Sequence, residues 1–474
     1  MLFNSLTFIV FFAIVLALHY SPLSWRIKKI SLLIASYLFY AAWNPLFIIL
    51  LWISTVVDWH VARWIYNEQD ERKRKGLLWL SLATNLGILG YFKYGGFLLE
   101  NWQAMMASVG IDYQVPEWSI ILPMGISFYT FQTMAYSLDV YFRRAQPARS
   151  FLDFSLFVTF FPQLVAGPIV RPGHLIPQFT TPHYARVNQF FWGMALVILG
   201  LFQKVVIADG FLAPIAEAVF DAKSAVGFTD AWLGTFAFAG QIFSDFAGYS
   251  TTAIGVALCL GFSLPTNFRF PYAAIGFSDF WRRWHISLST WLRDYLYIPL
   301  GGNRMSNTRT YINLMLTMLL GGLWHGASWN FVVWGGLHGS FLAMERFCSA
   351  RWGSLAVVSQ SWFRVVMALL TFLAINITWV FFRAADFTTS GNMISAMLGF
   401  APEDAATPLP YLYIIEVCVI MALLLLAHWK MRDTNLEDVV ARFPAWLVTA
   451  VLAVMTIAII FTQGTGNAFI YFQF

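Results

Sequence analysis

Long apolar runs separated by short polar segments fill this chain from end to end. A helix needs about 20 mostly apolar residues to cross the hydrocarbon core of a bilayer, and the runs leave room for about eleven to thirteen transmembrane and re-entrant helices. Membrane β-strands would instead alternate apolar and polar residues over about ten positions. The pattern therefore predicts an all-α polytopic membrane protein, folded as a single membrane domain over residues 1–474.

Some apolar runs are interrupted. The stretch from residue 160 to residue 177 cannot form one regular helix, because Pro168 and Pro172 each remove a backbone donor. Irregular backbone at membrane depth survives only where protein or a water-filled cavity covers it. We therefore expect re-entrant segments here and elsewhere in the chain.

Composition and charge agree with a membrane protein. Apolar residues make up 59% of the chain, charged residues 11%, and the mean hydropathy is +0.65, which excludes a soluble domain. The basic clusters at residues 26–29, 72–75 and 143–149 lie on one side of the membrane if two spans separate each from the next. By the positive-inside rule that side is cytoplasmic, so the N-terminus is expected outside. This asymmetry accounts for the net charge of +5 without a nucleic-acid partner.

Several kinds of chemistry lack their sequence signals. The chain has no Walker loop, no dinucleotide glycine motif and no HExxH pair, and the serine-hydrolase elbow occurs only as near misses such as residues 125–129. The three cysteines, Cys259, Cys348 and Cys418, are too far apart for a zinc site or a disulfide framework. We therefore expect no metal and no permanently bound cofactor.

Two histidines lie in a long stretch without charge. Residues 311–344 contain no Asp, Glu, Lys or Arg, yet they include His325 and His338. An imidazole at membrane depth needs a polar partner or a water-filled cavity, so it marks a candidate functional site. The alternative is a structural histidine that bonds a neighbouring carbonyl. Gly321 and Gly322 precede His325 and would let backbone or ligand approach closely.

Residues 278–307 form the second informative block, in which charges and aromatic residues interleave. Read as one interfacial helix, the block places a stripe on one face: Phe280, Trp284, Leu288, Trp291 and Tyr295. Arg282 and Arg293 lie away from that stripe. One interpretation is a membrane anchor whose arginines reach the lipid headgroups. The other is a cytoplasmic mouth that attracts a polyphosphate such as coenzyme A through four arginines, namely Arg282, Arg283, Arg293 and Arg304, with His285 on a path toward His325.

Five motifs occur in an order that resembles the membrane-bound O-acyltransferase family, and within it the bacterial alginate O-acetyltransferase branch. They are Leu122–Phe128 (LPMGISF), Phe161–Pro168 (FPQLVAGP), Gln241–Ser250 (QIFSDFAGYS), Asp279–Ser287 (DFWRRWHIS) and Leu323–Gly326 (LWHG). The resemblance covers a core of about residues 120–340. C-terminal helices are expected over about residues 360–474, and the segment beyond about residue 385 carries little of the resemblance.

The resemblance implies roles for several of these residues. His325 matches the family's catalytic histidine, set in a central funnel or tunnel across the membrane, and His285 matches a second histidine on its cytoplasmic side. Asp245, Tyr249 and Ser250 match a motif that we interpret as structural. His338 recurs in a Leu-His-Gly pattern for which packing is the expected duty.

The implied reaction is transfer of an acetyl group from cytoplasmic acetyl-CoA to an exported polysaccharide, alginate-like or another exopolysaccharide, directly or through a periplasmic relay protein. The implied location is the bacterial inner membrane. Histidine suits this task because its ordinary pKa is about 6.5. We hypothesise that His325 activates the acceptor hydroxyl and that His285 orients the donor or helps the thiolate leave. Asn313 and Asn330 are candidate donor-site residues that would bind the developing oxyanion.

Two other classes stay open. A transporter or flippase would use the histidines as a proton relay and the arginines to hold an anionic lipid or sugar. A scaffold subunit of a polysaccharide export complex would tolerate replacement of His325. Within the enzyme class, peptidoglycan, cellulose and other exopolysaccharides compete with alginate as acceptor.

Overall fold

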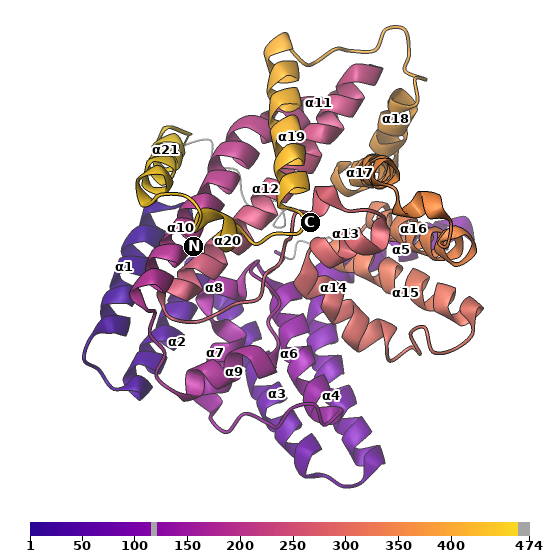
Figure 1. Ribbon diagram of the computed structural model, residues 1–474. Coiled ribbons are helices and arrows are strands. Elements are labelled where there is room, and N and C mark those ends of the chain that lie inside the picture. The colour runs from indigo at the N-terminus through magenta and orange to yellow at the C-terminus, as the bar shows by residue number, and fades with distance from the viewer. Residues whose placement is uncertain (115–120, 463–474) are drawn as a thin grey trace. The chain divides into compact units, whose positions relative to one another are not determined.

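The computed structural model describes residues 1–114 and 121–462, and its regular elements there are all helices (Figure 1). Six helical stretches of the described chain are long and apolar enough to cross a membrane: Pro45–Asn67, Val187–Phe220, Phe228–Cys259, Ser361–Arg383, Tyr411–Met431 and Ala445–Thr462. The predicted all-α polytopic membrane class is confirmed. The count of eleven to thirteen crossing and re-entrant helices, and the central funnel, stay predictions.

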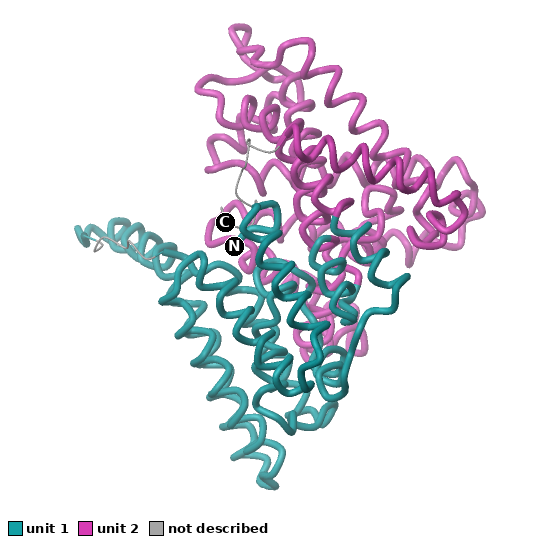
Figure 2. Tube along the Cα trace, turned by 90° about the vertical axis from the view of Figure 1, so that its left-hand side faces the viewer, with its two compact units in different colours: residues 1–197, 252–265 teal, residues 198–251, 266–474 magenta. Residues whose placement is uncertain are grey.

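The chain forms two compact units (Figure 2). One comprises residues 1–197 and 252–265, and the other residues 198–251 and 266–474. Two helices, α10 (Val187–Leu201) and α12 (Phe228–Cys259), continue from one unit into the other. All the candidate catalytic and donor-binding residues lie in the second unit, while the expectation of a single domain stays a prediction.

The elements of the first unit before α10 are α1 (Leu6–Tyr20), α2 (Trp25–Ala41), η1 (Pro45–Phe47), α3 (Ile48–Asn67), α4 (Glu71–Leu89), η2 (Gly90–Tyr94), α5 (Gly95–Ser108), α6 (Ile126–Tyr141), α7 (Phe151–Thr159), α8 (Phe161–Leu164) and α9 (Pro172–Thr180).

A buried carboxylate holds three helices of this unit together. Asp58 of α3 is fully buried and accepts hydrogen bonds from Asn85 of α4 at 2.8 Å and Ser137 of α6 at 3.0 Å. Because a buried carboxylate is costly without donors, these contacts fix how the three helices meet.

The proline-interrupted stretch of the first unit is irregular, as expected. Helix α8 ends at Leu164 and α9 begins at Pro172, and residues 161–170 between and around them are all buried. Gly125 packs against this stretch with φ +72°, and a Cβ there would lie 2.8 Å from the Leu164 carbonyl oxygen. Protein therefore covers the irregular backbone, which satisfies the requirement stated for membrane depth.

The elements of the second unit other than α10 and α12 are η3 (Phe202–Leu212), α11 (Ala213–Phe220), η4 (Pro271–Ala273), α13 (Phe277–Arg283), α14 (Ile286–Leu292), η5 (Arg293–Tyr297), α15 (Asn307–His325), α16 (Trp329–Trp352), η6 (Ala356–Ser359), α17 (Ser361–Arg383), α18 (Phe387–Met397), α19 (Tyr411–Met431), α20 (Leu436–Val440) and α21 (Ala445–Thr462).

Helices α15 and α16 form a hairpin that carries two of the histidines of this unit, and glycines line the seam between the two helices. Where α15 meets α16, a Cβ on Gly322 would lie 2.2 Å from the Phe331 carbonyl oxygen, and one on Gly335 would lie 2.3 Å from that of Met318. The sequence predicts that backbone or ligand approaches closely near Gly322, and in the structure the backbone of α16 does so.

The prediction of one interfacial helix over residues 278–307 is wrong. The segment divides into α13, α14 and the π-helix η5, and His285 at the first break adopts φ 42° and ψ 55°. The break arises because a neighbouring segment takes the backbone bonds: the Ile286 N–H donates to the Asn267 carbonyl and the Arg269 N–H to that of Arg283, both at 2.9 Å. The apolar stripe survives it, since its first four members, Phe280, Trp284, Leu288 and Trp291, are all buried.

Candidate active site

The two predicted catalytic histidines lie close together in the second unit. His325 is the last residue of α15 and is 2% exposed, and His285, just before α14, is fully buried. Their ring centroids are 6.4 Å apart. Trp324 contacts both rings, at 5.9 Å from His285 and 5.0 Å from His325. The structure thus brings together two residues that are 40 positions apart in the sequence.

Asn267 determines which nitrogen of His285 carries the proton. Its Oδ1 accepts from the Ser287 backbone N–H at 3.2 Å and from the Ser287 hydroxyl at 2.9 Å, while its Nδ2 donates to Ser250 Oγ at 3.1 Å. The same Oδ1 lies 3.1 Å from His285 Nδ1. Because an amide oxygen can only accept, Nδ1 must donate, and the basic lone pair of the neutral ring is on Nε2.

Aromatic side chains surround His325. The ring centroid of Trp334 lies 5.0 Å from that of His325, and the ring centroid of Phe382 lies 5.3 Å from it. Such walls exclude water, and in a dry site hydrogen bonds and charges act more strongly on a reacting group. The arrangement can hold a neutral imidazole beside a second one, and a neutral imidazole can act as a general base.

His338 has a structural environment. Thr378 donates its hydroxyl hydrogen to the Ile375 carbonyl at 2.7 Å, so its oxygen is left to accept from His338 Nε2 at 3.1 Å. The ring packs between aromatic side chains, with centroids 4.5 Å from Trp334 and 5.1 Å from Trp281. This hydrogen bond links α16 to α17 and agrees with the packing duty expected of His338.

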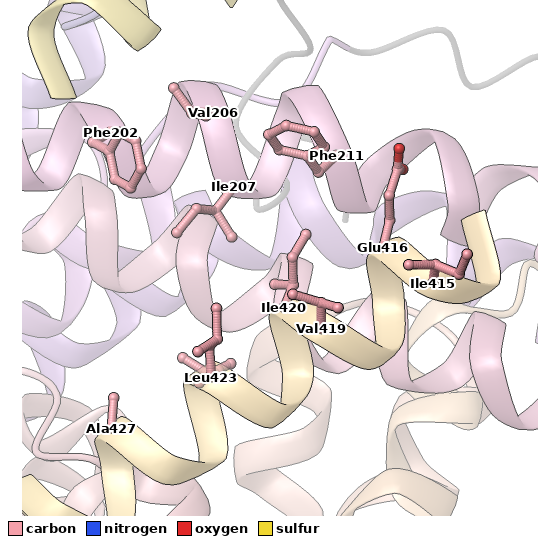
Figure 3. Close-up of a pocket in the computed structure, with 11 residues that line it drawn as sticks. Phe202, Val206, Ile207, Phe211, Ile415, Glu416, Val419, Ile420, Leu423 and Ala427 are labelled. Atoms are coloured by element: carbon pink, nitrogen blue, oxygen red, sulfur yellow. The ribbon is translucent and has the colours of Figure 1, made fainter. Parts of the chain in front are cut away.

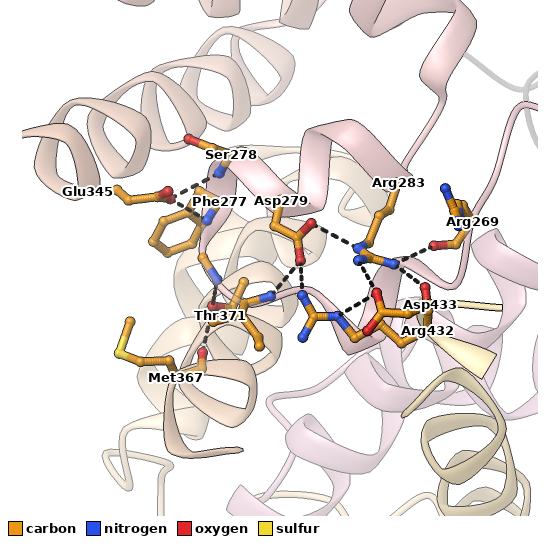
Figure 4. A network of polar contacts seen from close by, with 12 residues as sticks. Arg269, Phe277, Ser278, Asp279, Arg283, Glu345, Met367, Thr371, Arg432 and Asp433 are labelled. Atoms are coloured by element: carbon orange, nitrogen blue, oxygen red, sulfur yellow. Dashed lines mark hydrogen bonds and ion pairs between the residues drawn. The ribbon is translucent and has the colours of Figure 1, made fainter. Parts of the chain in front are cut away.

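Arg283 belongs to an ion-pair network at the end of α19 (Figure 4). Its Nε donates to Asp279 Oδ1 at 2.9 Å, and its Nη1 donates to the Arg432 carbonyl at 2.7 Å. Arg432 Nη2 donates to the other Asp279 oxygen at 2.8 Å. Burial lowers the pKa of the Arg432 guanidinium, and the Asp279 carboxylate opposes that effect. These contacts give Arg283 a structural role in joining α13 to the segment that follows α19.

The other predicted donor-binding arginines are at the surface. Arg293 is exposed and pairs with its neighbour Asp294 at 2.7 Å, and Arg282 and Arg304 are exposed as well. Arg282 and Arg293 thus lie away from the buried stripe, as predicted. A soluble anion can reach these three side chains without displacing a buried partner.

Both candidate oxyanion donors bind backbone. Asn313 donates to the Gly302 carbonyl at 3.1 Å, and Asn330 donates to the Ala384 carbonyl at 2.9 Å. The Asn330 oxygen also accepts from Ser390 at 3.3 Å. These bonds give both amides a structural duty, and their role toward a donor stays a prediction.

Asp245, from the motif interpreted as structural, is buried with two other charged residues. Lys204 pairs with Asp245 and with Asp209, each at 2.8 Å, and all three side chains are less than a tenth exposed. The triad ties η3 to α12 through opposite charges. This arrangement supports the structural interpretation of Asp245.

Sequence reasoning missed Asn267 and Thr378. Asn267 lies in a loop two residues after Pro265, where an asparagine is an ordinary turn residue, so nothing local distinguishes it. Thr378 is one of two threonines in an apolar helix and becomes notable only beside His338. Both act through contacts across at least 18 residues of sequence, which no local pattern encodes.

Comparison with known proteins identifies the family of this chain. Residues 143–383 match the family model of the membrane-bound O-acyltransferases. The chain is 42% identical over 404 residues to a probable alginate O-acetylase AlgI of Azotobacter vinelandii, covering 84% of this chain and 78% of the relative. It is 38% identical over 397 residues to a peptidoglycan O-acetyltransferase of Helicobacter pylori, covering 78% and 74%. A teichoic acid D-alanyltransferase of Streptococcus thermophilus is 29% identical over 242 residues, covering 48% and 57%.

These matches confirm the resemblance that the five motifs indicate, and the residues matched by the family model include both histidines. The protein is a multi-pass membrane O-acyltransferase, and the chain belongs to the membrane-bound O-acyltransferase family.

Proposed function

We propose that the protein transfers acetyl groups from cytoplasmic acetyl-CoA to a polysaccharide outside the bacterial inner membrane, with its N-terminus on the periplasmic side. Relatives named as alginate and peptidoglycan O-acetyltransferases support a polysaccharide acceptor. The observation that carries the proposal is the pair of buried imidazoles, His285 and His325, whose ring centroids are 6.4 Å apart.

The reaction needs a base and a route for one proton. His325 accepts the proton of the acceptor hydroxyl while the hydroxyl oxygen bonds to the thioester carbonyl carbon. The carbon–sulfur bond then breaks, and the proton ends on the departing coenzyme A thiolate. His285, whose basic Nε2 is set by Asn267, orients the donor or passes the proton to sulfur. A positioned base of this kind contributes about 10²- to 10⁴-fold to the rate.

The donor enters from the cytoplasm, where acetyl-CoA is made. Exposed Arg282 and Arg304 supply positive charge for its phosphates. The acceptor is alginate-like or another exopolysaccharide, reached directly or through a periplasmic relay protein that carries the acetyl group onward. No nucleic acid takes part.

The test is the O-acetyl content of secreted and cell-wall polysaccharides in cells that lack the protein. The cells are complemented with wild type, His325→Ala or His338→Ala at matched membrane expression. We expect wild type and His338→Ala to restore acetylation and His325→Ala to fail, and the polymer that regains acetyl groups identifies the acceptor. Equal rescue by all three proteins would contradict the proposal and favour a scaffold or a transporter.

A further inference from the structure

A narrow apolar groove lies along the outside of the second unit, between the π-helix η3 and α19 (Figure 3). Its volume is about 580 Å³. Eleven residues line it: Phe202, Val206, Ile207, Phe211, Ile415, Glu416, Val419, Ile420, Leu423, Leu424 and Ala427. Ten of them are apolar, and Ile415, Val419 and Leu423 are each more than half exposed. Both helical segments lie within stretches that could cross a membrane, so the groove opens toward lipid.

The length and setting of the groove suit a hydrocarbon chain. Its α19 side runs from Ile415 to Ala427, a length of about 18 Å at 1.5 Å per residue. An extended acyl chain can lie along this length against the side chains of both helices. Acyl chains are the material that surrounds an apolar surface at membrane depth, so a lipid is the occupant that this groove meets first.

Glu416 gives the groove chemical selectivity. It lies within the apolar stretch Tyr411–Met431, about 8 Å along α19 from its first residue, near the depth of the lipid headgroups. Figure 3 shows it near one end of the row of α19 side chains. In the part of the chain that the structure describes, no side chain donates a hydrogen bond to Glu416 or forms an ion pair with it. A carboxylate in this setting favours a cationic partner from outside the protein.

We propose that the groove is a lipid-binding site that holds one acyl chain of a phospholipid whose headgroup carries a primary amine. The chain lies against the apolar side chains of η3 and α19, and the ammonium group donates a hydrogen bond to the Glu416 carboxylate. A quaternary amine keeps its positive charge but has no N–H to donate, so lipids with choline headgroups lack the hydrogen bond to Glu416.

Delipidated protein in detergent tests the site. Native mass spectrometry counts bound lipids during titration with phosphatidylethanolamine or phosphatidylcholine of identical chains. Wild type should bind one phosphatidylethanolamine about tenfold more tightly than phosphatidylcholine, because of one hydrogen bond to a charged group. Val419→Trp, which fills the groove, should lose one bound lipid of either kind, whereas Glu416→Gln should keep the lipid and lose the preference.

The control is Leu426→Trp, on the same helix but not in the groove, which should behave as wild type. Equal binding of the two lipids by wild type overturns the headgroup part of the proposal. An unchanged lipid count in Val419→Trp overturns the site as a whole and leaves this surface to a protein partner.

Discussion

Replacing Asn267 by aspartate tests how His285 is held. The two side chains have the same shape, and the aspartate oxygen that replaces Oδ1 still accepts from Ser287 and from His285 Nδ1. Ser250 accepted from the amide, and its hydroxyl can rotate to donate to the new oxygen instead. We therefore expect Asn267→Asp to fold and to leave the ring in place.

The substitution changes the charge beside the ring. The Oδ1 atom of residue 267 lies 3.1 Å from His285 Nδ1. A negative charge within about 4–6 Å stabilises a protonated imidazole and raises its pKa by about 1 to 3 units. His325 is a second titratable group in ring contact with His285, with the two ring centroids 6.4 Å apart. If the reaction uses neutral His285, the acidic limb of the pH–rate profile should move to higher pH by about 1 to 3 units, with a tenfold loss of rate per unit below it.

The assay measures initial rates of acetyl transfer from acetyl-CoA as a function of pH, in purified wild-type and Asn267→Asp protein, and so rests on the proposed function. Thermal unfolding checks that both are folded. The double variant Asn267→Asp with His285→Gln should have its acidic limb at the same pH as His285→Gln alone, because no imidazole remains beside the carboxylate. An unshifted acidic limb in correctly folded Asn267→Asp would refute a role for neutral His285 in the reaction.

Three further substitutions have defined outcomes. Gly322→Ala should destabilise the protein by about 1–3 kcal/mol and lower its activity, because the new methyl group would meet a carbonyl oxygen at 2.2 Å, whereas Gly336→Ala, whose nearest contact would be 3.6 Å, should be near neutral; thermal unfolding compares the two. Asp279→Asn should cost about 1–3 kcal/mol in denaturant unfolding, since two guanidinium groups lose their charged acceptor, and unchanged stability would contradict the network. Arg304→Ala should raise KM for acetyl-CoA without lowering kcat, with an effect that shrinks as salt increases; an unchanged KM at low salt would remove Arg304 from the donor site.

Part of the fold can be predicted from local sequence because its causes are local. Runs of about 20 apolar residues specify membrane helices, and Pro168 and Pro172 prevent one continuous helix over residues 160–177 because each lacks a backbone donor. The break at His285 has a distant cause. Asn267 and Arg269 take up the backbone groups on either side of it, and helical periodicity in residues 278–307 contains no trace of that competition.

The candidate site divides in the same way. His325 can be found because imidazoles are rare in apolar segments, and His285 because it lies in the charged motif at residues 279–287, but their proximity depends on how α13, α14 and α15 pack. Arg283 looks equivalent to Arg282 in the sequence. Only the position of Asp279 and the chain after α19 makes one arginine structural and leaves the other exposed.

The hairpin of α15 and α16 has a consequence for biogenesis. Neither helix is among the six stretches of residues 1–114 and 121–462 that are apolar enough to cross a membrane. Segments enter lipid from the insertion machinery according to their apolarity, so this hairpin depends on neighbouring helices to receive it. Helix α17, which supplies Thr378 to His338 and Phe382 to His325, is synthesised after the hairpin. The surroundings of the histidines are therefore completed late in translation, and a nascent chain that ends before residue 378 cannot form them.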